Sequence, residues 1–192
     1  EAHAIGVIGE HGRGLAEQCG LSREIDVQMG TLSKALGCSG GYICGSRRLI
    51  DLLINRARSF IYSTALPPAV AAAATAAVEF LMSPKGESRR QVLRRNVAEF
   101  AGEMAHLFPD GKKVQSAIVP VVLGRSEAAL EASQMLADRG FFVPAIRYPT
   151  VPAGAARLRV TISAKHPARQ IADLGAALRE LPVVPHPHAA EE

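Results

Sequence analysis

Hydrophobic and polar residues follow different patterns before and after residue 83 of the chain. In the first part, two short segments bounded by glycine, residues 25–29 and 41–44, predict strands. Residues 48–58 and the apolar residues 67–81 predict two helices, and the paired prolines at the start of the second suit a helix N-terminus. These elements do not complete an alternating series of strands and helices, so we expect the sheet of this part to lack partner strands.

The second part begins with a predicted amphipathic helix. Apolar residues recur at spacings of three and four from Leu93 to Leu107, which places them on one helix face. Residues 109–111 (PDG) predict the end of this helix. Residues 117–123 predict a strand, in which Pro120 favours an edge or bulged position because it cannot donate to a ladder.

The remaining residues predict a helix, two strands and a last helix. Ser126 is expected to cap the first helix and Gly140 to close it, and residues 141–146 predict the next strand. Residues 157–162 alternate between polar and apolar side chains, so one strand face is apolar. The last helix has apolar residues on one side, and the tail from residue 182 is expected to be loose. That apolar side holds Ile171, Leu174, Leu178 and Leu181.

The patterns together predict an α/β chain with two parts. Residues 1–82 are expected to belong to one domain, and residues 83–192 to form a small C-terminal α+β domain. A hydrophobic fraction of 48% excludes a disordered chain. The net charge of +4 is small, and basic residues alternate with acids without aromatic side chains among them, which argues against nucleic-acid binding.

The sequence shows no clear membrane span, signal peptide or metal-binding motif. No apolar run approaches the ~20 residues of a membrane span, and no basic segment precedes an apolar one at the N-terminus, so a cytoplasmic protein is expected. Three cysteines show neither a CxxC motif nor a spacing with histidine that suits zinc. We therefore expect no metal site, and reduced cysteines that act as small buried hydrophobic residues.

The densest chemical signal is residues 30–37 (GTLSKALG), directly after a predicted strand. Glycines allow close approach of the backbone, the hydroxyls of Thr31 and Ser33 can bind an anion, and Lys34 can form an imine. This composition favours a phosphate-bearing cofactor. The motif taken alone is also compatible with an ordinary surface turn, and it is not a Walker loop because the order GxxxxGK[ST] is absent.

Three further segments make the pattern specific: residues 1–3 (EAH), 60–68 (FIYSTALPP) and 145–159 (AIRYPTVPAGAARLR). With the lysine motif, the chain resembles the α-oxoamine synthases, fold-type I enzymes that use pyridoxal 5′-phosphate (PLP) to condense an amino acid with an acyl-CoA. The resemblance implies that residues 1–82 are the C-terminal remainder of the large, PLP-binding domain. It also implies a homodimer with active sites at the subunit interface. Because only about the second half of a family member is matched, we expect the isolated chain to be incomplete and inactive.

Within this family, the lysine of the motif binds the cofactor covalently and moves the substrate α-proton, which assigns both roles to Lys34. The resemblance assigns His3 to a hydrogen bond with the phenolic oxygen of the cofactor, although a lone histidine is often structural. The family places an aspartate before the EAH motif to pair with the pyridine nitrogen, and the given sequence begins after that position.

The resemblance further implies that Thr31 contacts the cofactor, and that Ser63 and Thr64 reach its phosphate from the neighbouring subunit. The two hydroxyls before the paired prolines are equally compatible with a helix cap.

On the substrate side, Arg159 corresponds to the arginine that holds the amino-acid carboxylate, for which its planar fork is suited. Thr150 corresponds to a substrate-contacting threonine, and Arg147 is a candidate for the distal carboxylate of an acyl chain. Because Arg157 shares the strand face with Arg159, an exposed arginine pair is the alternative, and surface charge is the alternative for Arg147.

Among the reactions of this family, the sequence is most similar to the one that joins a pimeloyl thioester, on CoA or an acyl carrier protein, to L-alanine in biotin biosynthesis. The transfer of an acetyl or succinyl group from CoA to glycine is the alternative within the family. An inactive fragment or a dimerisation piece is the alternative from another class.

Overall fold

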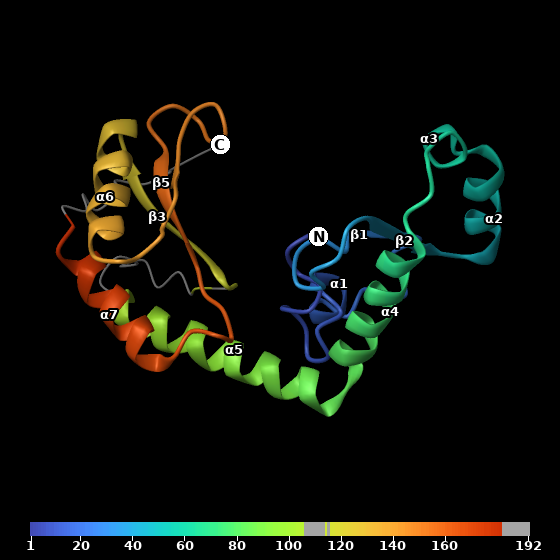
Figure 1. Cartoon of the computed structure of the whole chain (residues 1–192), viewed down its shortest axis with the longest axis horizontal. Coiled ribbons are helices and arrows are strands. Elements are labelled where there is room, and N and C mark those ends of the chain that lie inside the picture. Colours follow the sequence, from blue (N-terminus) through green and yellow to red (C-terminus); the bar gives the residue numbers. More distant parts are fainter. Residues whose placement is uncertain (106–113, 115, 182–192) are drawn as a thin grey trace. The chain divides into compact units, whose positions relative to one another are not determined.

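The computed structural model describes residues 1–105, 114 and 116–181 of the 192-residue chain (Figure 1). The chain divides into two compact units, Glu1–Arg90 and Gln91–Glu192. The predicted helix end at residues 109–111, the apolar Leu107 and the C-terminal tail lie outside the described residues. The division falls inside a helix that begins at Pro84, and the domain boundary after residue 82 stays a prediction.

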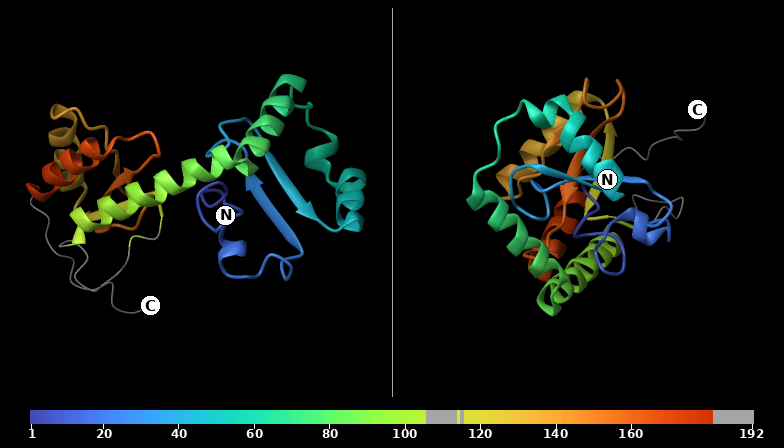
Figure 2. Two further views of the ribbon diagram at one scale, coloured as in Figure 1. Left: turned by 90° about the horizontal axis from the view of Figure 1, so that it is seen from below. Right: turned by 90° about the vertical axis from the view of Figure 1, so that its right-hand side faces the viewer.

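The first unit contains a two-stranded sheet among short helices. Strand β1 pairs with β2 in the antiparallel direction, with Gly30 opposite Tyr42, and Figure 2 shows the two strands next to each other. The two strands and the two helical regions predicted here are confirmed, with the first region, residues 48–58, divided at Ala57. The elements are α1 (Leu15–Gln18), β1 (Val27–Thr31), β2 (Gly41–Gly45), α2 (Arg47–Arg56), α3 (Arg58–Ile61), α4 (Pro68–Met82) and the start of α5 (Pro84–Glu103).

Burial in the first unit is sparse. Helices α2 and α4 bury none of their residues, and large apolar side chains such as Met29, Phe60 and Met82 are 66%, 65% and 77% exposed. An apolar helix gains most of its stability from a packed partner, and neither helix has that burial within this unit.

The second unit has a three-stranded antiparallel sheet in the order β3-β5-β4. Figure 1 shows α6 and α7 on one side of it. The alternation predicted for residues 157–162 is confirmed, because Leu158, Val160 and Ile162 are at most 3% exposed. Pro120 lies in the edge strand β3, as predicted. The elements are β3 (Ile118–Gly124), α6 (Ser126–Asp138), β4 (Ala145–Ile146), β5 (Ala156–Thr161) and α7 (Ala168–Arg179).

Two local predictions in this unit are wrong. Ser126 is the first residue of α6, and the N-cap is Arg125, without a side-chain hydrogen bond. The strand predicted for residues 141–146 is reduced to the two residues of β4. Gly140 does close α6, but the Phe141 N–H donates back to the Leu136 carbonyl (2.8 Å) in the same capping turn, and Pro144 has no N–H. Residues 141–143 therefore form no ladder, and the bonding to β5 starts at the Pro144 carbonyl, which accepts the N–H of Arg159 (3.0 Å).

The cysteines also differ from expectation. Cys19 and Cys44 are exposed and Cys38 is half-buried, with all three thiols free. They lie in the first unit, where little of the surface is covered, so they do not serve as small buried hydrophobic residues.

A buried amide joins α5 to the turn that follows β5. Asn96 is 1% exposed, and its Nδ2 donates to the carbonyl oxygens of Ser163 and His166, both at 2.9 Å. The N–H of Ser163 in turn donates to Nδ1 of His166 (3.2 Å). A single helix side chain therefore fixes both ends of this turn.

Replacement of Asn96 by leucine should destabilise the second unit by about 2–3 kcal/mol, because two carbonyl groups in a buried turn lose their donor. Native-state hydrogen exchange of the β3 and β5 amides measures this loss. Asn55→Leu is the matched control, because the amide of Asn55 also donates to a backbone carbonyl but on an exposed helix. Equal effects of the two substitutions would contradict the assigned role.

Candidate functional site

The lysine motif forms the loop that connects β1 to β2. Thr31, the last residue of β1, donates from its hydroxyl to the Gly40 carbonyl (3.3 Å) and lies 2.8 Å from the Ser33 hydroxyl. The Ser33 N–H donates to the Thr31 oxygen (3.2 Å), and the Cys38 N–H donates to the Leu32 carbonyl (2.7 Å). These bonds close the loop on both sides of Lys34.

Two glycine contacts bring the other motifs of this unit to the loop. A Cβ added to Gly6 would lie 2.9 Å from the Cβ of Ala35, so the segment that carries His3 packs against the residue after Lys34. A Cβ added to Gly40 would lie 2.8 Å from Cδ1 of Leu66, so residues 60–68 approach the other end of the loop. Three segments that are far apart in sequence therefore meet at the lysine loop.

Lys34 and His3 are both exposed in the described structure. Among the described residues, the Lys34 ammonium takes part in no hydrogen bond or ion pair. Ala4, which follows His3 in the sequence, is 6% exposed, and Leu36, two residues after Lys34, is 8% exposed. Buried residues therefore anchor the backbone beside each of the two exposed polar side chains. The exposed amine of Lys34 is therefore accessible to a ligand.

The loop fits the cofactor implied by the motif. PLP needs an accessible primary amine for its aldehyde and hydroxyl or N–H donors for its phosphate. Lys34 supplies the amine, and Thr31 and Ser33 supply two adjacent hydroxyls. The space beside Gly37 is open, because a Cβ placed on it would meet no atom within 4 Å. Two hydroxyls suited to a phosphate and a lysine suited to an imine thus lie on one short loop.

Ser63 and Thr64 are exposed on the connection between α3 and α4. The Ser63 hydroxyl donates to the carbonyl of Ser59, one helical turn earlier. The N-cap of α4 is Pro67, with no side-chain hydrogen bond. The alternative that these hydroxyls cap α4 is therefore wrong, and their assignment to the phosphate stays a prediction.

Tyr42 is a residue of this site that the sequence analysis missed. Its ring covers Gly30 across the hairpin, because a Cβ on Gly30 would clash with the Tyr42 hydroxyl and ring. Burial raises the pKa of the Tyr42 phenol, and the negative charges of Cys44 and Glu1 raise it further. An aromatic residue opposite a strand glycine was the available signal, since aromatic rings commonly cover such glycines.

The three predicted substrate residues lie in the second unit. Arg159 is half-buried on β5, whereas Arg147 and Thr150 are exposed in the loop between β4 and β5. That loop is closed by the Thr150 N–H, which donates to the Arg147 carbonyl (2.9 Å), and it contains the cis peptide bond between Tyr148 and Pro149. The two loop residues therefore belong to one turn.

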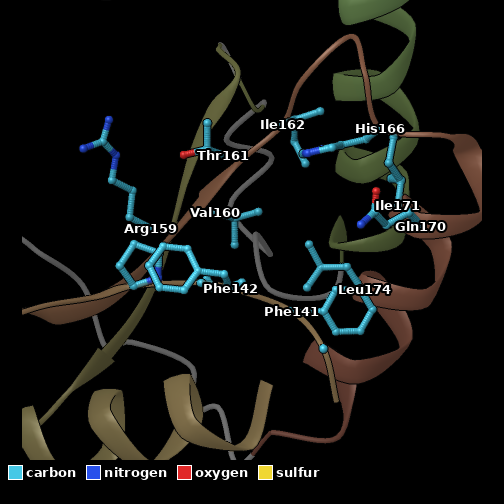
Figure 3. A pocket seen from close by; sticks show the side chains of 13 residues that line it. Phe141, Phe142, Arg159, Val160, Thr161, Ile162, His166, Gln170, Ile171 and Leu174 are labelled. Atoms are coloured by element: carbon cyan, nitrogen blue, oxygen red, sulfur yellow. The ribbon is translucent and has the colours of Figure 1, made fainter. Parts of the chain in front are cut away.

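A hollow of about 580 Å³ lies beside Arg159. Figure 3 shows the Arg159 guanidinium pointing away from the apolar walls formed by Phe141, Ile171 and Leu174. Arg157 is half-buried and its Nε donates to the carbonyl of Ala155 (3.0 Å), whereas no side-chain hydrogen bond or ion pair of Arg159 is found among the described residues. Arg159 is thus the arginine of this strand face whose fork is free for a carboxylate.

The part of the chain that the structure describes contains no group of three or more His, Cys, Asp or Glu residues that could hold a metal ion. None of its helices combines the length and the apolar character that crossing a bilayer requires.

Comparison with known proteins identifies relatives of both units. The family model for aminotransferase class I and II matches residues 1–178. The chain is 51% identical over 186 residues to the 8-amino-7-oxononanoate synthase of Anaeromyxobacter dehalogenans strain 2CP-1, a match that covers 95% of this chain and 46% of that protein. The chain therefore spans about half the length of the curated relatives it matches.

Solved structures give the same relationship. A structure of serine palmitoyltransferase (SPT) with a PLP internal aldimine is 34% identical, with a TM-score of 0.86 over 96% of this chain and 47% of that chain. The 8-amino-7-oxononanoate synthase from Francisella tularensis is 28% identical, with a TM-score of 0.77 over 93% of this chain and 53% of that chain. The predicted α/β fold is confirmed by these similarities.

Proposed function

The chain belongs to the aminotransferase class I and II family, and we propose that its protein is a PLP-dependent acyltransferase that condenses L-alanine with a pimeloyl thioester. The product would be 8-amino-7-oxononanoate, formed with loss of carbon dioxide, in biotin biosynthesis. The observation that carries the proposal is the 51% identity to an 8-amino-7-oxononanoate synthase over 95% of this chain.

The cofactor assignment is supported by the lysine loop. When bound, PLP supplies an electron sink for the substrate α-carbon. Lys34 would hold the cofactor through its ε-nitrogen and, once released, would take and return the α-proton from the adjacent position. Thr31 would donate to the cofactor, and His3 would hydrogen-bond its phenolic oxygen. Residues 1–82 would then be the remainder of the cofactor-binding domain, and residues 83–192 the small domain.

The remaining roles follow from the family pattern. Arg159 would bind the carboxylate of the amino acid, with Thr150 contacting the substrate and Arg147 positioned for the distal carboxylate of the acyl chain. Ser63 and Thr64 would reach the phosphate bound by a second subunit, which requires a homodimer. We further propose that the enzyme acts in the cytoplasm.

A substrate comparison tests the reaction. The complete gene product should turn over L-alanine with pimeloyl-CoA or pimeloyl-carrier protein, and should show at least ~10²-fold lower kcat/KM with glycine and acetyl-CoA or succinyl-CoA. Product formation is measured by thioester cleavage together with release of carbon dioxide. Turnover with glycine alone would reject the pimeloyl assignment and favour glycine C-acetyltransferase or 5-aminolevulinate synthase activity.

A second candidate is that the isolated chain serves only as an inactive piece or a dimerisation piece. The exposed apolar residues of the first unit favour it, because large uncovered patches drive association. Purified chain mixed with PLP would then stay colourless while the complete gene product turned yellow. A yellow, borohydride-reducible adduct in the isolated chain would exclude this candidate.

A further inference from the structure

Arg90 on α5 is an unusual buried charge in the first unit. The residue is only 5% exposed, and arginine is rarely buried without partners. Its Nε and Nη2 donate to one carboxylate oxygen of Glu87 (3.2 and 2.6 Å), and its Nη1 donates to the carbonyl of Leu81 (2.7 Å). The guanidinium therefore ties the start of α5 to the last turn of α4.

The aliphatic stem of Arg90 makes a second contact, with Gly12. This glycine has a φ of +74°, and a Cβ placed on it would lie 2.8 Å from Cδ of Arg90. The Gly12 carbonyl accepts the N–H of Gly6 at 2.8 Å. Arg90 thus supports the backbone bond that closes the turn in which His3 lies.

The turn that carries His3 packs against the lysine loop. Gly6 has a φ of +79°, and a Cβ on it would lie 2.9 Å from the Cβ of Ala35 and 3.3 Å from Cδ1 of Leu81. Leu81 is the residue whose carbonyl Arg90 binds. The side chain of Arg90 is therefore connected to the residue after Lys34 by two short routes, one through Gly12 and one through Leu81.

We propose that Arg90 is a positioning residue that holds the segment carrying His3 against the loop carrying Lys34. It acts through Gly12 and Gly6, while its own donors bind Glu87 and Leu81. The inference rests on the proposed function for its meaning in catalysis, because that function gives His3 and Lys34 their roles. The link itself, the contacts of Arg90 with Gly12 and Leu81 and of Gly6 with Ala35, involves only residues of the first unit.

Both parts of the Arg90 side chain are needed for this link. The three-carbon stem fills the space beside Gly12, and the planar fork binds a carboxylate and a carbonyl in different directions. Methionine retains an apolar stem but has no donor, so Arg90→Met releases Leu81 and Glu87. Lysine has one donor group at the end of a flexible stem, so Arg90→Lys restores only part of the link.

Hydrogen exchange of the full chain tests the link without cofactor. Arg90→Met should increase exchange of the Gly6 and Cys38 amides by about 10-fold or more, because the bonds to Gly12 and Leu32 open more often. Exchange in β5 of the second unit should not change. Arg90→Lys should restore part of the protection, and Arg89→Met, at an exposed neighbouring position, should have no effect.

A second variant covers the case in which Arg90→Met does not fold. Gly12→Ala places a methyl group against the Arg90 stem and leaves the bonds to Glu87 and Leu81 available. It should increase exchange at the same two amides. Unchanged exchange at Gly6 and Cys38 in either folded variant, or an equal increase in β5, would overturn the inference.

A double-mutant cycle then connects the link to the cofactor. In the complete gene product, Arg90→Met should slow the capture of PLP as a borohydride-reducible lysine adduct about 10-fold when His3 is present, and less than ~2-fold in the His3→Ala background. Equal slowing in both backgrounds would show that Arg90 does not act through His3. Absence of any adduct in the unmodified protein would instead reject the proposed function, while the exchange result would still decide the link.

Discussion

Replacing Lys34 by alanine is expected to abolish covalent binding of PLP and to lower kcat by at least ~10³-fold in the complete enzyme. The reason is that one amine serves both as the attachment point of the cofactor and as the acid and base for the α-proton. The loop around it should remain folded, because its closing bonds come from Thr31, Leu32 and Gly40 and not from the lysine side chain.

Borohydride reduction followed by mass spectrometry of the peptide that contains Lys34 measures this loss. Lys85→Ala is the matched control, since Lys85 is an exposed lysine at the start of α5 in the same unit, and it should keep both the adduct and the activity. A yellow, reducible adduct and full turnover in Lys34→Ala would contradict the assignment of this site.

Replacing Arg159 by methionine should lower kcat/KM for the amino acid by about 10²-fold, which corresponds to ~3 kcal/mol of lost interaction with the carboxylate. KM for the amino acid should rise, whereas the affinity for PLP should not change, because the proposed partner of Arg159 is the amino-acid carboxylate and not the cofactor. Arg159→Lys should restore only part of the loss, since an ammonium group cannot bind both carboxylate oxygens in the manner of the guanidinium fork.

Arg157→Met is the control for charge on the same strand face. Its guanidinium already donates to the Ala155 carbonyl, so its loss should change kcat/KM by less than ~3-fold. Steady-state kinetics with varied amino acid at saturating thioester separate the two variants. Equal losses in both would support the alternative of an exposed arginine pair without a specific substrate role.

Much of the fold could be predicted because local signals and burial agree. The alternation of residues 157–162 predicts the strand that β5 forms. The spacing from Leu93 to Met104 predicts the buried face of α5, because Phe100 and Met104, which follows the last helical residue, are fully buried. The strand predicted at residues 141–146 is mostly absent, for a local reason that the hydrophobic pattern does not show. The capping turn of α6 uses the N–H of Phe141, so an apolar and aromatic run becomes a connection with Phe142 92% exposed.

The candidate site likewise has residues that the sequence predicted and residues that it did not. The motif at residues 30–37 identified the lysine and its neighbouring hydroxyls, because the chemistry of an imine and a phosphate requires those residue types close together in sequence. Arg90 and Asn96 were overlooked, although both fall on the side of α5 that otherwise carries apolar residues. A polar residue at such a position was the available signal, since a buried polar group needs a specific partner.

The sequence by itself therefore determined the type of the main elements, the family resemblance and the lysine proposed to bind the cofactor, since each depends on residues that are neighbours along the chain or repeat at a fixed period. Only the tertiary structure decided which distant segments meet at that lysine. The contacts between Gly6 and Ala35, between Gly40 and Leu66, and between Gly12 and Arg90 depend on the absence of a Cβ at close approaches of the backbone. Partners in such contacts are chosen by packing in three dimensions, which no local pattern of side chains specifies.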